Sequence, residues 1–332
     1  MMYLRTPRGV GESVRRRLLA DGVFDIRGRV EKDGEFLLFP ITEPVYIEGA
    51  EVIERDGKRR TLRPRSLSDT LGGTLTEDEL RELPTSYNVV GDIAILELGE
   101  ALMPRRREIG EALLATFPAI KVAAVKVEQV QGEYRVPKVQ VVAGEARSET
   151  MHREHGCVYR LDVAKAYFTP RLGSERMRVV SQIRDTERVL VMFAGVGPYA
   201  ILAAKKTNAE VTAVELNPDA VRYMRWNVLK NRVNVNVIEG DVRAVVPTLG
   251  HFDRIIMPLP KLADTFLDVA AAALKPHGII HYYSFAHNTL EATGYLAETV
   301  GALGKRAIIL AVVPCGSYSP CMERYCVDFK LE

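Results

Sequence analysis

Short apolar segments alternate with helix-like segments from about residue 178 onward, and this alternation constrains the fold more than any other feature of the chain. The apolar segments are expected to be strands at 189–193, 210–215, 235–239, 254–257 and 278–284. The segments between them predict helices at about 199–206, 219–231 and 264–275. Strands and helices in this order form βαβ units on a parallel sheet. Residues 177–332 are therefore predicted to be a doubly wound α/β domain.

Two extended runs close this domain. They lie at 306–313 and 324–329, after a last predicted helix at 288–303, and a turn rich in Gly, Ser and Pro joins them. Such a turn suits an antiparallel hairpin. A doubly wound sheet that ends in an antiparallel pair is typical of methyltransferases.

The remaining half of the chain is expected to hold two smaller domains. A length of 332 residues suggests two or three domains, at about 100–200 residues each. Residues 1–65 predict a small α/β domain with a helix at 11–21 and extended segments at 24–26 and 35–41. It ends in a basic patch: Lys58, Arg59, Arg60, Arg63 and Arg65.

Residues 66–85 are polar and predict a linker with one short helix around 77–83. Residues 86–176 predict an α+β middle domain, in which Pro104 opens a helix at 105–117. Its strands are expected at 89–98, 120–127, 136–142 and 158–163.

Composition excludes several classes of protein. With 47% hydrophobic and 27% charged residues, the chain is globular rather than disordered or fibrous. No apolar run reaches the roughly 20 residues of a membrane span, and the N-terminus does not resemble a secretion signal. We therefore expect a soluble cytoplasmic protein. The cysteine spacing lacks the C-x-x-C pairs of a zinc site, so no metal is expected. A net charge of +2 identifies no polyanionic partner by itself.

A nucleotide site is predicted where the first strands of the doubly wound sheet end. The first strand leads into Phe193, Gly195 and Gly197, and a helix is expected from Pro198. The glycines allow a tight turn and a close approach of a ligand. Glu215 closes the second strand, where a carboxylate accepts hydrogen bonds from ribose hydroxyls.

Asp241 follows the third strand and is placed to contact the exocyclic amine of an adenine. Glycine turns also serve purely structural roles, so the turn alone is weak evidence. Three features on successive strand ends are more specific. A dinucleotide needs its pyrophosphate at the helix N-terminus, whereas S-adenosylmethionine depends on acidic and backbone contacts. Asp241 and the terminal strand pair favour S-adenosylmethionine.

Several short motifs occur in one order across nearly the whole chain. The longest spans 162–176 and contains Pro170-Arg171-Leu172 and Glu175-Arg176. The others lie at 86–94, 132–135, 144–156, 192–198 and 318–320. In this order they resemble the archaeal and eukaryotic tRNA (guanine-N1)-methyltransferases that modify guanosine 37, beside the anticodon.

The resemblance implies a Rossmann-type class I methyltransferase domain, preceded by an α+β middle domain and a small N-terminal α/β domain. The N-terminal domain of this family docks on the outer corner of tRNA. The resemblance therefore implies S-adenosylmethionine as cofactor and tRNA as partner, through its anticodon loop and its outer corner. No membrane or obligate protein partner is expected.

The resemblance also implies roles for single residues. Glu175 would be the general base, and Arg135 would contact the target guanine. Arg171 and Arg176 would help to hold the base or the backbone, and Tyr167 would lie against the methyl donor. Without the resemblance, a surface or ion-paired carboxylate is the commoner reading of Glu175, and for Arg135 an exposed strand arginine and a functional residue are about equally favoured.

Two positions depart from the family pattern. Family members usually have Asp at Val191 and Asn at Pro258. Pro258, in a double-proline turn, is either structural or a substrate contact, and it offers only its backbone carbonyl. The change at Pro258 therefore puts a side-chain amide contact from this strand in doubt.

Three other functions are considered. A wybutosine-pathway enzyme would transfer a methyl or aminocarboxypropyl group to a tricyclic guanosine derivative at the same position of tRNA. A nicotinamide-dependent dehydrogenase would leave the arginines of the N-terminal domain, among them Arg15, Arg16 and Arg17, without a role. A noncatalytic RNA-binding protein would not need a nucleotide pocket.

Overall fold

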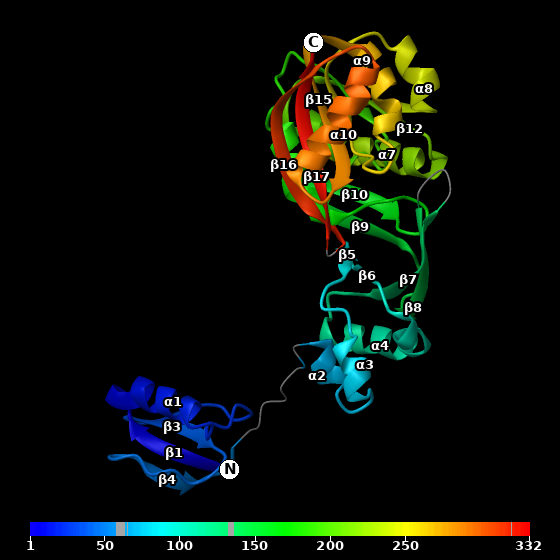
Figure 1. Cartoon of the computed structure of the whole chain (residues 1–332). Coiled ribbons are helices and arrows are strands. Elements are labelled where there is room, and N and C mark those ends of the chain that lie inside the picture. The colour runs from blue at the N-terminus through cyan, green and yellow to red at the C-terminus, as the bar shows by residue number, and fades with distance from the viewer. Residues whose placement is uncertain (58–63, 65, 132–135, 320) are drawn as a thin grey trace. The chain divides into compact units, whose positions relative to one another are not determined.

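A computed structural model describes the chain from residue 1 to 332, apart from residues 58–63, 65, 132–135 and 320 (Figure 1). The chain divides into two compact units, Met1–Asp69 and Thr70–Glu332. In the described part of the chain, no helix is both long and apolar enough to cross a membrane.

The first unit is a four-stranded sheet covered by one helix. Its strands are β1 (Met2–Pro7), β2 (Glu31–Asp33), β3 (Phe36–Ile41) and β4 (Glu51–Glu54), in the order β2-β3-β1-β4. Helix α1 (Gly11–Ala20), which follows the short helix η1 (Arg8–Val10), packs Val14 and Leu18 against Leu4 and Phe39. The helix is as predicted, whereas the extended segment at 24–26 forms only one bridge, Phe24 to Ile41. The predicted basic patch lies outside the described residues.

Helix α2 (Leu67–Leu71) spans the boundary of the two units, and the second unit continues with α3 (Glu77–Arg81) and a mixed sheet. The predicted linker therefore contains one helix more than expected. The sheet has the order β5-β6-β7-β8, with β5 (Asn88–Val90), β6 (Ile93–Leu96), β7 (Val122–Gln131) and β8 (Val136–Gly144). Helices η2 (Glu100–Arg105) and α4 (Arg106–Thr116) connect the parallel strands β6 and β7.

The strand expected at 89–98 is instead two strands that turn at Gly91. Gly91 has a φ of +59°, and a Cβ atom there would lie 2.2 Å from Oγ1 of Thr150. Thr150 lies on β9 (Glu149–Glu154), which pairs with β10 (Cys157–Asp162) in a separate antiparallel hairpin. The absence of a side chain at Gly91 thus lets the turn approach β9, a strand that the sequence did not predict.

Two asparagine side chains join this hairpin to helix α7 (Pro218–Asn231). The Asn231 amide accepts from the Val158 N–H at 2.8 Å and donates to the Val158 carbonyl at 2.7 Å. Asn227 does the same with Arg160, at 2.7 and 3.1 Å, and also donates to the Val196 carbonyl at 3.0 Å. The two side chains thus satisfy backbone groups of β10 as a neighbouring strand would.

Replacing Asn227 with alanine is expected to destabilise the second unit by about 1–3 kcal/mol, because buried backbone groups lose their partners. The chain has one tryptophan, Trp226, which lies on α7, so its fluorescence in urea reports the unfolding of this unit. Lys230→Ala, an exposed change on the same helix, should stay within about 0.5 kcal/mol of the unchanged protein. Equal urea midpoints for the two variants would contradict the proposed contribution of the Asn227 hydrogen bonds to stability.

The rest of the second unit is built on a seven-stranded sheet in the order β13-β12-β11-β14-β15-β17-β16. Its strands are β11 (Arg188–Met192), β12 (Glu210–Glu215), β13 (Asn236–Glu239), β14 (Phe252–Met257), β15 (Leu274–Ala286), β16 (Ala307–Ser319) and β17 (Met322–Leu331). The first five run parallel, and β17 pairs antiparallel with both β15 and β16. The doubly wound sheet and its antiparallel end are therefore as predicted.

Helices cover both faces of this sheet. Helices α5 (Gly173–Val180), α6 (Pro198–Lys206) and α7 pack on one face. Helices α9 (Leu267–Ala273) and α10 (Thr289–Ala302), with residues of α8 (Val242–Val245) and η4 (Val246–Thr248), pack on the other. Short helices η3 (Pro170–Leu172) and η5 (Asp264–Phe266) precede α5 and α9. Helix α5 was not predicted from the sequence, and it carries Glu175.

Candidate active site

The turn between β11 and α6 has the open backbone that the sequence predicts for it. Gly195 and Gly197 have φ angles of +58° and +87°, and Phe193 has +55°. A Cβ atom at Gly197 would lie 2.8 Å from Cγ of Met224, so a side chain does not fit there. At Gly195 a Cβ atom would meet only the carbonyl of Tyr167, at 3.6 Å. The backbone at Gly197 is therefore packed against Met224, whereas the backbone at Gly195 has free space beside the Tyr167 carbonyl.

Glu215 lies directly against this turn. Its carboxylate accepts hydrogen bonds from the N–H groups of Gly195, at 2.7 Å, and Asn217, at 2.8 Å. Burial raises the pKa of this carboxyl, which favours a role as hydrogen-bond partner rather than as an exposed charge. Asp241, after the neighbouring strand, is exposed and accepts from the N–H of Arg243 at 2.8 Å.

The ends of β11, β12 and β13 thus bring together glycine backbone, one half-buried carboxylate and one exposed carboxylate. This donor and acceptor set fits a nucleoside with ribose hydroxyls and an amine, and it offers no cationic side chain to a pyrophosphate. The residues present therefore fit S-adenosylmethionine. Tyr167, 46% exposed, has its backbone carbonyl beside the open side of the turn.

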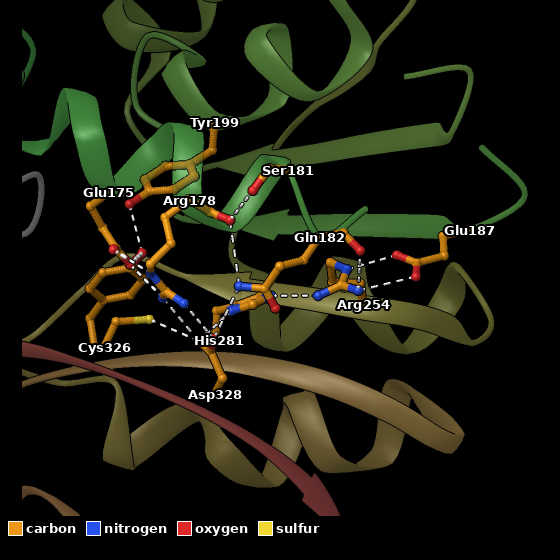
Figure 2. A network of polar contacts seen from close by, with 11 residues as sticks. Glu175, Arg178, Ser181, Gln182, Glu187, Tyr199, Arg254, His281, Cys326 and Asp328 are labelled. Carbon is orange, nitrogen blue, oxygen red and sulfur yellow. Dashed lines mark hydrogen bonds and ion pairs between the residues drawn. The ribbon is translucent and has the colours of Figure 1, made fainter. Parts of the chain in front are cut away.

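Glu175 is nearly buried, with 5% of its surface exposed, and its carboxylate is held by two residues (Figure 2). Arg178, one turn further along α5, donates from Nε to Oε2 at 2.7 Å and from Nη2 to Oε1 at 2.8 Å. Tyr283 on β15 donates its hydroxyl to Oε1 at 2.7 Å. The Tyr199 and Tyr283 hydroxyls lie 2.7 Å apart, which links Glu175 to the second residue of α6.

Glu175 therefore lies near the strand ends that carry the glycine turn. Tyr282 pairs with Met257, so Tyr283 lies level with Pro258, the residue that follows β14. Pro258 is partly exposed, and the Leu259 N–H donates back to the Met257 carbonyl at 2.8 Å, which shapes the double-proline turn.

The ion pair of Glu175 continues into a chain of buried polar groups. Arg178 also donates to both carboxylate oxygens of Asp328, at 2.6 and 3.1 Å. Asp328 lies 2.6 Å from Nδ1 of His281, and Nε2 of His281 lies 2.7 Å from Arg254, which pairs with Glu187. Because Arg254 can only donate, Nε2 accepts and Nδ1 carries the proton of a neutral imidazole.

Ionisation in this chain follows from its contacts. Burial lowers the pKa of His281, in agreement with the neutral ring. Burial alone would raise the pKa of Asp328, but hydrogen bonds from His281 and Arg178 hold it well below its usual range. Asp328 is therefore a carboxylate at neutral pH.

His281, Cys326 and Asp328 place three potential metal-binding atoms within 4.8 Å of one another. Both ring nitrogens of His281 already have partners, and two guanidinium groups, of Arg178 and Arg254, lie against the same cluster. A cation there would meet two positive charges. The contacts therefore favour a hydrogen-bonded cluster over a metal centre.

The other predicted site residues lie in different environments. Arg171 is exposed. Arg176 is 2% exposed and pairs with Glu154, from Nε at 2.7 Å and from Nη2 at 2.5 Å. Of the two arginines, Arg171 is the one open to a ligand. Arg135 lies outside the described residues.

Sequence reasoning missed the two partners of Glu175, Arg178 and Tyr283, and also Asp328, the second partner of Arg178. A helix over 173–180 would have placed Glu175 and Arg178 on one face, three residues apart. Asp328 stands in the apolar run Cys326-Val327-Asp328-Phe329, where a charge in an interior strand needs a partner. These two signals were available in the sequence, whereas the pairing of Arg178 with Asp328 was not.

Comparison with known proteins agrees with this architecture. The TRM5/TYW2 methyltransferase domain matches residues 150–301, the TYW2 N-terminal domain 67–148, and the tRNA methyltransferase 5 N-terminal domain 4–51. The tRNA (guanine(37)-N(1))-methyltransferase Trm5b of Pyrococcus abyssi is 39% identical over 99% of this chain and 99% of its own length.

A second relative, the tRNA 4-demethylwyosine(37)-methyltransferase Taw21 of Saccharolobus solfataricus, is 39% identical over 59% of this chain and 76% of its own length. Among solved structures, the complex of aTrm5 with tRNALeu matches with a TM-score of 0.83 and 29% identity, over all of both chains. The resemblance that the sequence motifs indicated is thus confirmed along the whole chain, and the chain belongs to the TRM5/TYW2 methyltransferase family.

Proposed function

We propose that the chain transfers a methyl group from S-adenosylmethionine to ring nitrogen 1 of guanosine 37 in tRNA. The observation that carries the proposal is the placement of Glu175, a buried carboxylate, near the strand ends that hold the glycine turn. A full-length relative named for this reaction and a solved relative bound to tRNA support it.

Guanine needs a base because its N1 carries a hydrogen and the ring delocalises the nitrogen lone pair. In the proposed reaction Glu175 takes the N1 proton, N1 forms a bond to the methyl carbon, and the carbon–sulfur bond of the donor breaks. The guanine is then N1-methylated and neutral, Glu175 holds the proton, and the sulfonium becomes a thioether. General-base catalysis of this kind contributes typically about 10²–10⁴-fold.

Negative charge spreads to the exocyclic oxygen of guanine as its proton leaves. By family resemblance we assign its stabilisation to Arg135, whose guanidinium is always charged and offers several donors. Arg171, exposed and four residues before Glu175, is assigned to the target base or its backbone. The family resemblance gives Arg176 the same role, but its pairing with Glu154 favours holding the β9–β10 hairpin against α5.

The cofactor side of the site uses groups already described. Glu215 is assigned to the ribose hydroxyls, Asp241 to the adenine amine, and Phe193, Gly195, Gly197 and Tyr167 to the walls of the pocket. Bound there, S-adenosylmethionine supplies an electrophilic methyl group. The chain itself has to align N1 with that methyl, a positioning effect that contributes several kcal/mol. The target guanosine must leave its stack to reach Glu175.

The first unit is proposed to contact the outer corner of tRNA, and the second unit the anticodon loop. Arg15, Arg16 and Arg17 on α1 are exposed, and each pairs with an acidic residue of the same helix or its end, Glu12 or Asp21. Exposed ion pairs of this kind are weak. Phosphate groups can therefore compete for these arginines.

The proposed substrate is tested with two tRNA transcripts that carry guanosine or adenosine at position 37. We expect 1-methylguanosine from the first transcript and no methylated nucleoside from the second, as read by mass spectrometry, because Glu175 acts on a ring N–H that adenine lacks at position 1. Equal methylation of both transcripts would show that the target is elsewhere in the tRNA.

A methyltransferase of the wybutosine pathway is the second candidate, because the demethylwyosine enzyme Taw21 shares 39% identity with this chain. That match covers 59% of the chain, whereas the relative named for guanine 37 matches 99% of it, including the first unit. The longer match to the relative named for guanine 37 therefore favours guanosine as the substrate at position 37. A third tRNA, carrying 4-demethylwyosine at position 37, separates the two activities in the same assay.

A further inference from the structure

The carboxylate of Glu175 has one acceptor position left among its contacts with described residues. A carboxylate offers about four acceptor positions, two on each oxygen. Oε1 accepts from Tyr283 and from Nη2 of Arg178, and Oε2 accepts only from Nε of Arg178. If Glu175 is the base, the proton therefore arrives on Oε2 while Oε1 stays fixed.

Tyr283 can act on Glu175 only as a donor. Its single hydroxyl proton lies toward Oε1, so the Tyr199 hydroxyl donates in turn to the oxygen of Tyr283. Burial raises the pKa of both tyrosines well above the usual value, so both stay protonated. A hydrogen bond to the ionised form of an acid weakens its affinity for a proton.

Arg178 stands between two carboxylates, and this division limits its effect on Glu175. Nη2 donates to both, at 2.8 Å to Glu175 and 3.1 Å to Asp328, while Nη1 donates to Asp328 at 2.6 Å. Nδ1 of His281 lies 2.6 Å from Oδ1 of Asp328, the oxygen that Nη2 of Arg178 also contacts. Asp328 therefore offsets part of the positive field that the guanidinium exerts on Glu175.

We propose that Tyr283 and Asp328, on the neighbouring strands β15 and β17, are positioning residues that set the proton affinity of Glu175 in opposite directions. This inference rests on the proposed function of Glu175 as the base. Tyr283 lowers that affinity and fixes Oε1. Asp328 raises the proton affinity of Glu175, because it also binds Arg178 and offsets part of its positive charge. The ion pair between Arg178 and Glu175 can then orient the carboxylate while Glu175 still accepts a proton.

Tyr199, Cys315 and Cys326 also face Glu175 but do not share this role. Among the described residues, the groups that face it from its own helix, α6 and the three adjacent strands are Arg178, Tyr199, Tyr283, Cys315, Cys326 and Asp328. Burial raises the pKa of Cys315 to about 12 and that of Cys326 well above its usual value. Both thiols are therefore neutral in the range in which a carboxylate base loses its proton.

The test is the pH dependence of single-turnover methyl transfer to a tRNA with guanosine at position 37. For Tyr283→Phe we expect the acid limb of the profile to move to higher pH, because the carboxylate loses a donor. Tyr282→Phe is the matched control, because Tyr282 precedes Tyr283 on β15 but packs in the core of the opposite face. Its acid limb should stay in place.

Asp328→Asn should move the same limb to lower pH and reduce the plateau rate, because Arg178 then acts on Glu175 with its full charge. A purely structural role would lower the rate at every pH and leave the limb where it is. The proposal therefore predicts that the acid limb moves to higher pH in Tyr283→Phe and to lower pH in Asp328→Asn. If the asparagine variant does not fold, as judged by its urea transition, the Tyr283 result decides alone.

The failure of this inference is distinct from the failure of the proposed function. If Glu175→Gln abolishes transfer while Tyr283→Phe leaves the acid limb unmoved, the positioning role of Tyr283 is overturned and Glu175 remains the base. If Glu175→Gln keeps the full rate, the proposed base is wrong, and the inference about its neighbours is overturned with it.

Discussion

Replacing Glu175 with glutamine is expected to slow single-turnover methyl transfer to tRNA by about 10²–10⁴-fold, the usual contribution of a general base. An amide keeps the size of the side chain but does not take up the N1 proton. The fold should tolerate the change, because Arg178 keeps both of its hydrogen bonds to Asp328. The measurement is rapid-quench transfer of a labelled methyl group with enzyme in excess over tRNA.

Two controls separate loss of the base from loss of the site. Calorimetric affinity for S-adenosylmethionine should be unchanged in Glu175→Gln, because the proposed cofactor contacts lie on other residues. Glu210→Gln changes an exposed carboxylate at the start of β12, which pairs with Arg188, and should leave the transfer rate unchanged. A Glu175→Gln enzyme that transfers methyl at the normal rate would exclude Glu175 as the base.

Local patterns in the sequence were sufficient to predict the doubly wound sheet and its glycine turn. Each of these elements is a continuous segment with the hydrophobic pattern of a single strand or helix, as at 210–215, 254–257 and 219–231. Pro198 begins α6, because its fixed φ suits the first turn of a helix. Strand β9 and helix α5 were missed because both are short and polar. Their apolar faces are too small for periodicity to identify them.

The surroundings of Glu175 could not be predicted for a different physical reason. Arg178 and Asp328 lie 150 residues apart and meet only because β17 inserts between β15 and β16. Spacing along the chain carries no information about such a contact. The sequence does show that Asp328 lies within an apolar strand, where a buried carboxylate needs a hydrogen-bond donor.

Loss of charge at the two arginines of the 162–176 motif is expected to affect two different properties, stability for Arg176 and tRNA binding for Arg171. Arg176→Met should destabilise the second unit by about 3–5 kcal/mol, because Glu154, at 9% side-chain exposure, is left as a buried carboxylate without its guanidinium partner. Arg171→Met should change stability by less than about 0.5 kcal/mol, since Arg171 is exposed, and should instead weaken binding of tRNA. Trp226 fluorescence in urea measures the first effect, and KM for tRNA the second.

The pH dependence of the Arg176 effect identifies its cause. Burial alone would raise the pKa of Glu154, but hydrogen bonds from His152 and Arg176 lower it from 4.5 to about 2. A lowered pKa gives stability that is complete above pH 4.5 and is lost as the pH falls toward 2. The difference in stability between the unchanged protein and Arg176→Met should therefore be largest near neutral pH and narrow below pH 4.5, as Glu154 is protonated in the variant and no longer needs a partner. A difference that stays constant down to pH 3 would instead assign the loss to packing of the arginine side chain over Phe168.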